Sequence, residues 1–105
     1  MSAFRFSIIT PDKKQYEGAA LSVTVSGENG RLTVLARHTP MLAVLVQGHI
    51  TIRTEKELLT GQTGPGILRV DRDETVALVH SFQWDGDESE VEVSASAVRE
   101  DGLLL

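Results

Sequence analysis

The sequence predicts an all-β fold, an antiparallel sandwich or barrel built from many short strands. Short segments in which apolar and polar residues alternate with period two recur along the chain, which is typical of half-buried strands. Glycine, proline, asparagine and aspartate separate these segments, as turns require. No segment before Ser81 has the 3.6-residue apolar period of a helix.

The first part of the chain predicts a series of strands that ends in a hairpin. Residues 4–8 and 21–26 alternate cleanly, and a shorter strand is expected over 16–18. Asn29 and Gly30 then separate the strand over 21–26 from an apolar segment at 32–35. Because both residues tolerate positive φ, Asn-Gly is a strong hairpin signal. We therefore expect the strand that ends at Ser26 to pair with residues 32–35.

Pro40 predicts a corner at the middle of the chain. Proline cannot donate to a strand ladder, and it favours an extended conformation at the residue before it. The next segment, residues 42–46, is apolar throughout, which predicts a short strand covered on both faces. The chain should therefore leave one strand at Pro40 and turn into another.

The second half predicts further strands and a different tail. Strands are expected over residues 49–53, 58–63, 67–70, 75–79 and 81–84. The acidic loop of residues 85–90 follows, and residues 91–93 predict one more edge strand. Residues 94–100 predict at most about two helical turns. The expected division is a β-sandwich domain over 1–84 and a loop and tail over 85–105, packed on the same domain.

Length and charge restrict the classes of function. The chain has 105 residues, enough for one domain, and it contains no cysteine. The net charge is −5, the basic residues are scattered along the chain, and aromatic residues are few. Nucleic-acid binding favours clustered positive charge with stacking aromatics, so we set that class aside. Without a leader or a long apolar run, the expectation is a soluble protein.

The residues offer little support for catalysis or for a bound cofactor. His38, His49 and His80 match no metal-ligand spacing, and no nucleophile elbow or cysteine is present. The loop of residues 85–90 could bind calcium, but it lacks the residue order and the flanking helices of an EF-hand, so a solvated acidic loop is favoured. We therefore predict no catalytic residue, no metal site and no cofactor.

A set of ordered motifs resembles a known family. The motifs include Phe-x-Phe-x-Ile-Ile-Thr-Pro from Phe4, Val-x-Val-x-Gly-Glu-x-Gly from Val23, and His-x-Pro-Met-Leu from His38. Gly-Ile-Leu-x-Val from Gly66 and Val-x-Leu-Val from Val76 continue the series. Together they resemble the N-terminal β-sandwich of the epsilon subunit of rotary proton-translocating ATP synthases, called delta in mitochondria. The resemblance extends from about Phe4 to Val79.

The resemblance implies a flattened sandwich of two roughly five-stranded antiparallel sheets in the central stalk. Such a subunit binds the gamma subunit and the c ring without catalysing a reaction, and it helps to couple proton flow to ATP synthesis. By position, the gamma-facing residues would be Thr10, His38, Met41, Leu42 and Ala43. The residues that face the c ring would be Glu28, Asn29, Gly30 and Arg31. The implied location is the cytoplasmic face of the bacterial inner membrane, and the isolated chain should be a monomer.

Some positions depart from the family pattern. Arg31 stands where members often have an acid, and members commonly have a glycine near Arg37. Full-length members continue into a C-terminal helical hairpin, which we do not expect within these 105 residues. An alternative is a free-standing β-sandwich interaction module unrelated to ATP synthesis, because a fold alone does not determine function.

Overall fold

The computed structural model describes residues 2–86, and these form ten strands and no helix. The strands are β1 (Phe4–Ile9), β2 (Lys14–Ala20), β3 (Ser22–Gly27), β4 (Gly30–Leu35), β5 (Met41–Leu45), β6 (Gly48–Arg53), β7 (Leu58–Thr63), β8 (Gly66–Val70), β9 (Glu74–Val79) and β10 (Phe82–Trp84). All ten strands expected within 1–84 are therefore confirmed. The edge strand at 91–93 and the helical turns at 94–100 lie outside the described residues.

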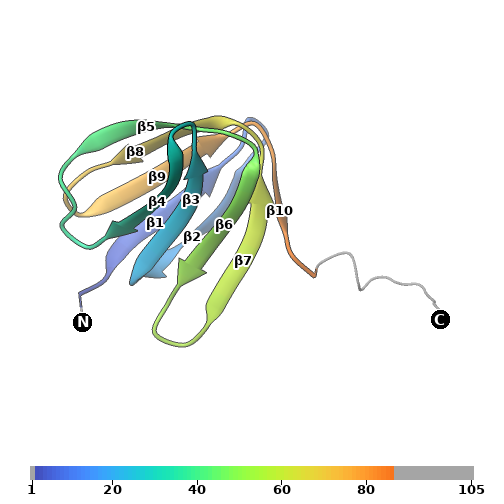
Figure 1. Ribbon diagram of the computed structural model, residues 1–105. Coiled ribbons are helices and arrows are strands. Elements are labelled where there is room, and N and C mark those ends of the chain that lie inside the picture. Colours follow the sequence, from blue (N-terminus) through green and yellow to red (C-terminus); the bar gives the residue numbers. More distant parts are fainter. Residues whose placement is uncertain (1, 87–105) are drawn as a thin grey trace.

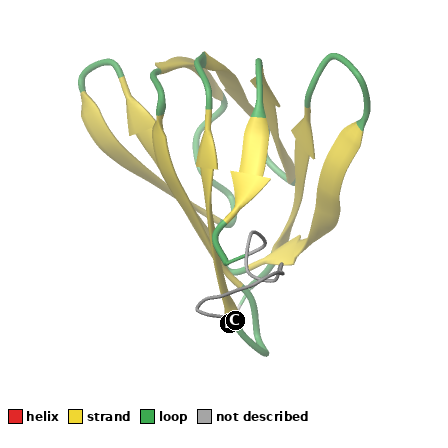
Figure 2. Ribbon diagram, turned by 90° about the vertical axis from the view of Figure 1, so that its right-hand side faces the viewer, coloured by secondary structure: helices red, strands yellow, loops and turns green. Residues whose placement is uncertain are grey.

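The strands form two layers of five (Figures 1 and 2). Sheet one has the order β5-β8-β9-β1-β2, and sheet two has the order β4-β3-β6-β7-β10. The two sheets join where β3 pairs with β5 at Gly27 and Leu45. β1 and β9 pair in parallel, and every other pairing among the described strands is antiparallel. The predicted sandwich is thus confirmed, with one parallel pair that the antiparallel prediction did not include.

The core lies between the two sheets and follows the period-two pattern. Alternate residues of each strand point inward, for example Phe6 and Ile8 from sheet one and Val23 and Ile52 from sheet two. These four side chains are completely buried. Because successive side chains point to opposite faces of a sheet, clean alternation in the sequence predicts which residues form this core.

Aromatic side chains close the side of the sandwich opposite the β3–β5 junction. The ring of Tyr16 on β2 lies 6.2 Å from that of Phe6 and 5.6 Å from that of Trp84 on β10. The rings of Phe82 and Trp84 are 4.6 Å apart and nearly perpendicular. Gly61 on β7 permits this packing, because a Cβ there would come within 3.0 Å of the Phe82 ring. The edge strands of the two sheets therefore meet through ring contacts.

The predicted hairpin and corner are both present. β3 and β4 pair along their whole length, with Glu28 and Asn29 in the turn and Gly30 at φ 118°. The segment between Leu35 and Met41 carries the chain from sheet two to sheet one, and it contains Pro40. Positive φ falls on Gly30 and not on Asn29, so one glycine provides the unusual backbone geometry of this hairpin.

Candidate interaction surfaces

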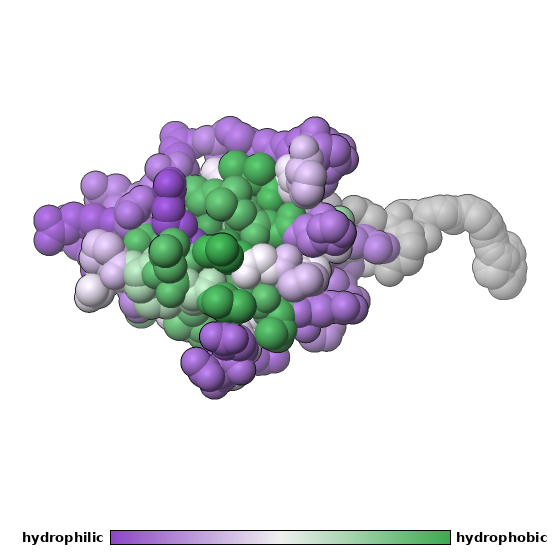
Figure 3. All heavy atoms as spheres, turned by 90° about the horizontal axis from the view of Figure 1, so that it is seen from above, coloured by the Kyte–Doolittle hydropathy of each residue, from purple (hydrophilic) through white to green (hydrophobic). Residues whose placement is uncertain are grey.

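Sheet one has an apolar outer surface. Val44 on β5 pairs with Ile67 on β8, which pairs with Leu78 on β9. Their exposed fractions are 49%, 45% and 47%, and that of Leu42, two residues before Val44, is 71%. We call Leu42, Val44, Ile67 and Leu78 the apolar face. Figure 3 shows apolar side chains gathered on the β5 side of the molecule, with hydrophilic side chains around them.

This arrangement corrects the prediction that residues 42–46 are covered on both faces. Leu45 is 2% exposed and faces the core, whereas Leu42, Val44 and Val46 are exposed. The fully apolar segment thus has one buried face and one solvent-facing face. Soluble monomeric proteins rarely expose a large contiguous apolar patch, and such patches are often interaction sites.

Only one residue of the predicted Met41, Leu42 and Ala43 group lies on the apolar face. Leu42 is the most exposed of the large apolar residues in the described part of the chain. Met41 and Ala43 are half-buried and pack against the core cluster. Because side chains alternate along a strand, the neighbours of an outward-facing Leu42 must point inward. The residues that the sequence reasoning missed are Val44, Ile67 and Leu78.

His38 and Thr10 lie at different ends of sheet one. His38 is half-buried before β5, and its Nδ1 is 2.8 Å from the Thr39 carbonyl oxygen. Thr10 follows β1, whose last residue Ile9 pairs with Leu78 near the end of β9. The pairing from Leu78 through Ile67 leads to Val44, so Thr10 lies near the far end of β5. The structure does not bring these two predicted residues together.

Thr10 has a clear structural role in a turn. Its hydroxyl lies 2.7 Å from Asp12 Oδ1 and 3.1 Å from the Lys13 carbonyl oxygen, and Gln15 Nε2 donates to it at 2.9 Å. Thr10 is 5% exposed. The hydrogen bond from the Thr10 hydroxyl lowers the pKa of Asp12 below its usual value. Thr10 is therefore a turn residue with little surface available to a partner.

The predicted c-ring residues lie beside the apolar face. Glu28, Asn29, Gly30 and Arg31 are all exposed. The Glu28 amide donates to the Val44 carbonyl at 3.0 Å, which fixes the turn against β5. This turn and residues Met41, Leu42, Ala43 and Val44 line one open hollow of about 330 Å³. In Figure 1 the β3–β4 turn lies next to β5.

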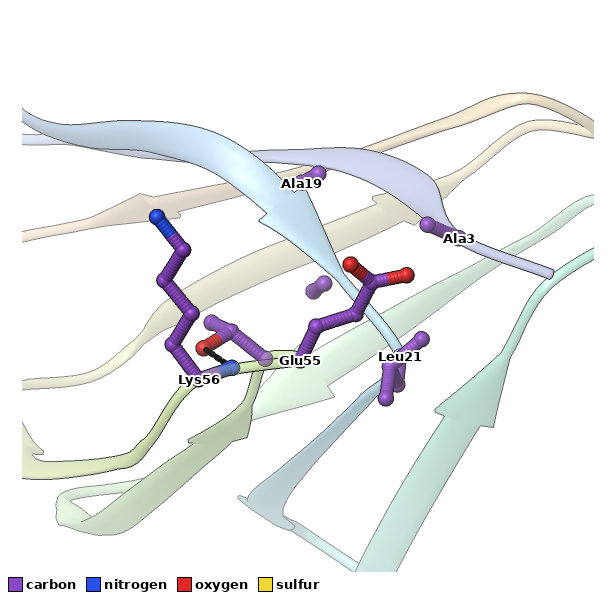
Figure 4. Close-up of a pocket in the computed structure, with 7 residues that line it drawn as sticks. Ala3, Ala19, Leu21, Glu55 and Lys56 are labelled. Carbon is purple, nitrogen blue, oxygen red and sulfur yellow. Dashed lines mark hydrogen bonds between the residues drawn. The ribbon is translucent and has the colours of Figure 1, made fainter. Parts of the chain in front are cut away.

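A second hollow, of about 290 Å³, lies at the opposite end of β3 (Figure 4). Ala3, Ala19, Ala20 and Leu21 form its apolar part, and Thr54, Glu55 and Lys56 contribute polar groups. The carboxylate of Glu55 lies on the side of the hollow where Leu21 is, while the ammonium of Lys56 points away from Leu21. Both side chains are exposed, so no buried acid or base is available here for catalysis.

Within residues 2–86, no group of three or more metal-ligating side chains comes together. His49 and His80 are exposed, and the acidic loop lies mostly beyond Gly86, outside the described residues. This part of the chain also has no helix long and apolar enough to cross a membrane. The features that the geometry does assemble are an apolar sheet face and an exposed turn beside it.

The fold and its surfaces define a class: a small β-sandwich domain with an exposed apolar face on one of its two sheets. The sequence identifies the family. Residues 3–85 match the ATP synthase delta/epsilon chain β-sandwich domain. The chain therefore belongs to this family, in agreement with the resemblance seen in the sequence.

Curated relatives support the same assignment. The ATP synthase epsilon chain of Sulfurimonas denitrificans is 38% identical over 80 residues, covering 75% of this chain and 62% of the relative. The Micrococcus luteus epsilon chain is 35% identical over 77 residues, covering 72% of this chain and 85% of the relative. This chain thus spans less than two thirds of the Sulfurimonas protein.

Solved structures share the fold at low sequence identity. A chain of the Euglena gracilis mitochondrial ATP synthase superposes with a TM-score of 0.76 at 14% identity, covering 88% of this chain and 57% of that one. A chain in the central stalk and c-ring structure of the Tetrahymena thermophila enzyme gives 0.68 at 17% identity, covering 90% and 73%. At these identities the likeness establishes the fold.

Proposed function

We propose that this protein is a non-catalytic central-stalk subunit of a rotary proton-translocating ATP synthase. In this proposal the apolar face docks on the gamma subunit, and the turn of Glu28, Asn29, Gly30 and Arg31 contacts the c ring. The subunit helps to couple proton flow to ATP synthesis and needs no cofactor of its own. It acts at the cytoplasmic face of the bacterial inner membrane as a peripheral part of the complex.

The observation that carries the proposal is the row of Val44, Ile67 and Leu78 across sheet one. These residues come from three strands and are each nearly half exposed, although each belongs to a strongly apolar type. Burying the exposed half of one such side chain in an interface contributes on the order of 1 kcal/mol, because burial of the whole side chain contributes about 1.5–3 kcal/mol. Several together can supply the hydrophobic centre of a protein–protein interface.

The neighbouring 28–31 turn supports contact with two partners at once. It shares a hollow with Leu42 and Val44, so a subunit covering the apolar face would reach the edge of this turn. The turn itself projects beyond β3 and β4 and is exposed. A rigid two-residue hairpin turn presents its side chains in one defined orientation, which suits contact with a second, adjacent surface.

The proposal predicts tight binding to a cognate assembly of gamma and the c ring. Leu78→Asp should weaken this binding about 10- to 100-fold, because a carboxylate then has to be buried in an apolar contact. Leu58→Asp is the matched control, since Leu58 is a leucine of similar exposure (54%) on the outer side of sheet two. Its affinity should match that of the wild-type protein when measured by biolayer interferometry.

The same experiment can reject the proposal. Wild-type protein that fails to bind the gamma–c-ring assembly would favour the free-standing interaction module instead. Equal weakening by Leu78→Asp and Leu58→Asp would show that the apolar face has no special role. Circular dichroism of both variants must show a cooperative thermal transition, so that lost binding is not lost folding.

A further inference from the structure

Arg37 occupies a backbone position that favours glycine. The amide of His38 donates to the Leu35 carbonyl at 3.3 Å, which closes a four-residue turn with Ala36 and Arg37 at its centre. Arg37 has φ 64° and is the one non-glycine residue with positive φ in the described part of the chain. A turn with positive φ at its third position alone is of the type II kind, which prefers glycine or asparagine there.

The Arg37 side chain makes no polar contact within the described residues that would offset the unfavourable backbone conformation. Arg37 is exposed, and its guanidinium makes no hydrogen bond or ion pair with residues 2–86. The ion pairs of this part of the chain instead involve Arg5, Lys14 and Arg69. A left-handed conformation is unfavourable for a residue with a Cβ, so arginine here destabilises the turn without a compensating contact.

The position of the turn indicates where a compensating contact could form. The turn lies in the corner between β4 and β5, directly before the strand that carries Leu42 and Val44. A partner that covers the apolar face would therefore pass close to the corner. The guanidinium offers a planar set of donors that matches a carboxylate in two parallel hydrogen bonds.

We infer that Arg37 is a docking residue whose guanidinium pairs with a carboxylate of the subunit that covers the apolar face. This inference rests on the proposed function and adds the chemistry of the partner at one point of the contact. In this inference, the strained backbone at Arg37 is tolerated because it places the guanidinium at the rim of the interface. At a rim the charge contributes to orientation and association rate as well as to affinity.

A protein carboxylate fits this corner better than a lipid phosphate. Recognition of an anionic membrane surface requires several basic residues close together. Besides Arg37, the strand register places Arg69 beside Leu42, but Arg69 lies 3.5 Å from the carboxylate of Asp71, and the whole chain carries a net charge of −5. An arginine without an acidic partner beside an apolar patch instead matches the usual composition of protein–protein interfaces, where arginine is enriched.

The test uses Arg37→Gly, Arg37→Asn and the control Arg53→Gln, each in the full chain. Arg53 is an exposed arginine on β6 with no ion pair to the described residues. Arg37→Gly should raise the melting temperature by about 5 °C, because it relieves the strained turn. Both Arg37 variants should weaken binding to the gamma–c-ring assembly about tenfold, with a reduced dependence on salt. Arg53→Gln should leave the affinity unchanged.

Each contrary result has a distinct meaning. If the wild-type protein does not bind the assembly, both this inference and the proposed function fail. If it binds and Arg37→Gly binds equally well, the proposed function stands and the inference is wrong. No rise in melting temperature would show that the turn is not strained, which removes its basis. Arg37-dependent binding to anionic vesicles, with unchanged binding to the assembly, would assign the arginine to lipid and also overturn the inference.

Discussion

One row of side chains on the outer surface of each sheet differs in chemistry between the two sheets, although both belong to one small domain. On sheet one, Val44, Ile67 and Leu78 form an apolar row. On sheet two, the corresponding row consists of threonines that pair across four strands, Thr33, Thr24, Thr51 and Thr60. The Thr24 and Thr33 hydroxyl groups lie 2.9 Å apart and form a hydrogen bond. Threonine gives sheet two the β-branched shape that strands favour together with a surface that water can solvate.

The comparison shows how an exposed apolar face can be encoded in a strand sequence. Strands of sheet two alternate between apolar and polar residues, as in Ser22-Val23-Thr24-Val25. Strands of sheet one become apolar at consecutive positions, as in Val76-Ala77-Leu78-Val79. The inner face needs only every second residue. Apolar residues at the remaining, outward-facing positions therefore predict a second apolar surface.

The largest expected effects concern the core that the two sheets share. Leu68→Ala in sheet one and Ile52→Ala in sheet two each remove a side chain that is completely buried. Each should lower the free energy of unfolding by about 2–5 kcal/mol, because a cavity remains. Urea denaturation followed by tryptophan fluorescence measures both, and Trp84 is the one tryptophan. A much smaller loss for Leu68→Ala would mean that sheet one does not share a common core with sheet two.

A smaller effect on stability and a large effect on binding are expected when sheet one is given the chemistry of sheet two. The combined change Val44→Thr, Ile67→Thr and Leu78→Thr replaces the apolar row with threonines. Affinity for the gamma–c-ring assembly should fall about 100-fold or more, because several buried apolar contacts are lost. The melting temperature should change little, since all three side chains are already near half exposed.

The reverse exchange is the control. Thr24→Val and Thr51→Val together extend apolar character over sheet two. This variant should bind the assembly no more tightly than the wild-type protein does. A gain in affinity would contradict the assignment of the docking surface to sheet one and would show that any apolar sheet surface is sufficient.

The smallest expected effect is on acid stability at the edge of sheet one. The hydrogen bond and charge of Lys14, with a further contribution from Arg5, lower the pKa of Glu17 below its usual value. The Glu17 carboxylate lies 2.9 Å from Lys14 Nζ and 2.7 Å from Arg5 Nη1. Because the pKa is lower in the folded state, the stabilisation is present above the unfolded pKa and is lost as the pH falls through the folded pKa.

Glu17→Gln should therefore destabilise the protein slightly at neutral pH and have no effect in strong acid. Melting curves of the variant and the wild-type protein, recorded from pH 7 down to pH 2, measure this difference. All the groups are exposed, so the effect should be small. A difference that persists unchanged to pH 2 would show that the carboxylate charge is not its cause.

Much of the fold could be predicted from the sequence because local patterns dominate it. Period-two alternation placed the strands, and the Asn29-Gly30 pair placed the hairpin, which β3 and β4 confirm. The parallel pairing of β1 with β9 was missed, because the paired residues are 69 positions apart in the sequence and no local signal relates them. The aromatic contact between Tyr16 and Trp84 was missed for the same reason.

The candidate site was predicted less completely. Leu42 lies on the apolar face, but Met41 and Ala43 point toward the core. Ile67 and Leu78 join the face through the strand order of sheet one, which the sequence alone does not specify. Their signal was present as apolar residues at consecutive strand positions. The absence of the usual glycine near Arg37 was noted from the sequence, but the left-handed backbone that favours glycine at this position is given by the structure.

The most direct test of the account is solvent access to the two outer surfaces in the assembled complex. The chain has no cysteine, so Leu78→Cys and Leu58→Cys each introduce a single reactive thiol. The rate of alkylation of each thiol is measured in the free protein and again in the gamma–c-ring assembly. The account predicts strong protection at position 78 and an unchanged rate at position 58. Equal rates at position 78 in the free and assembled states, with protection at position 58, would contradict it.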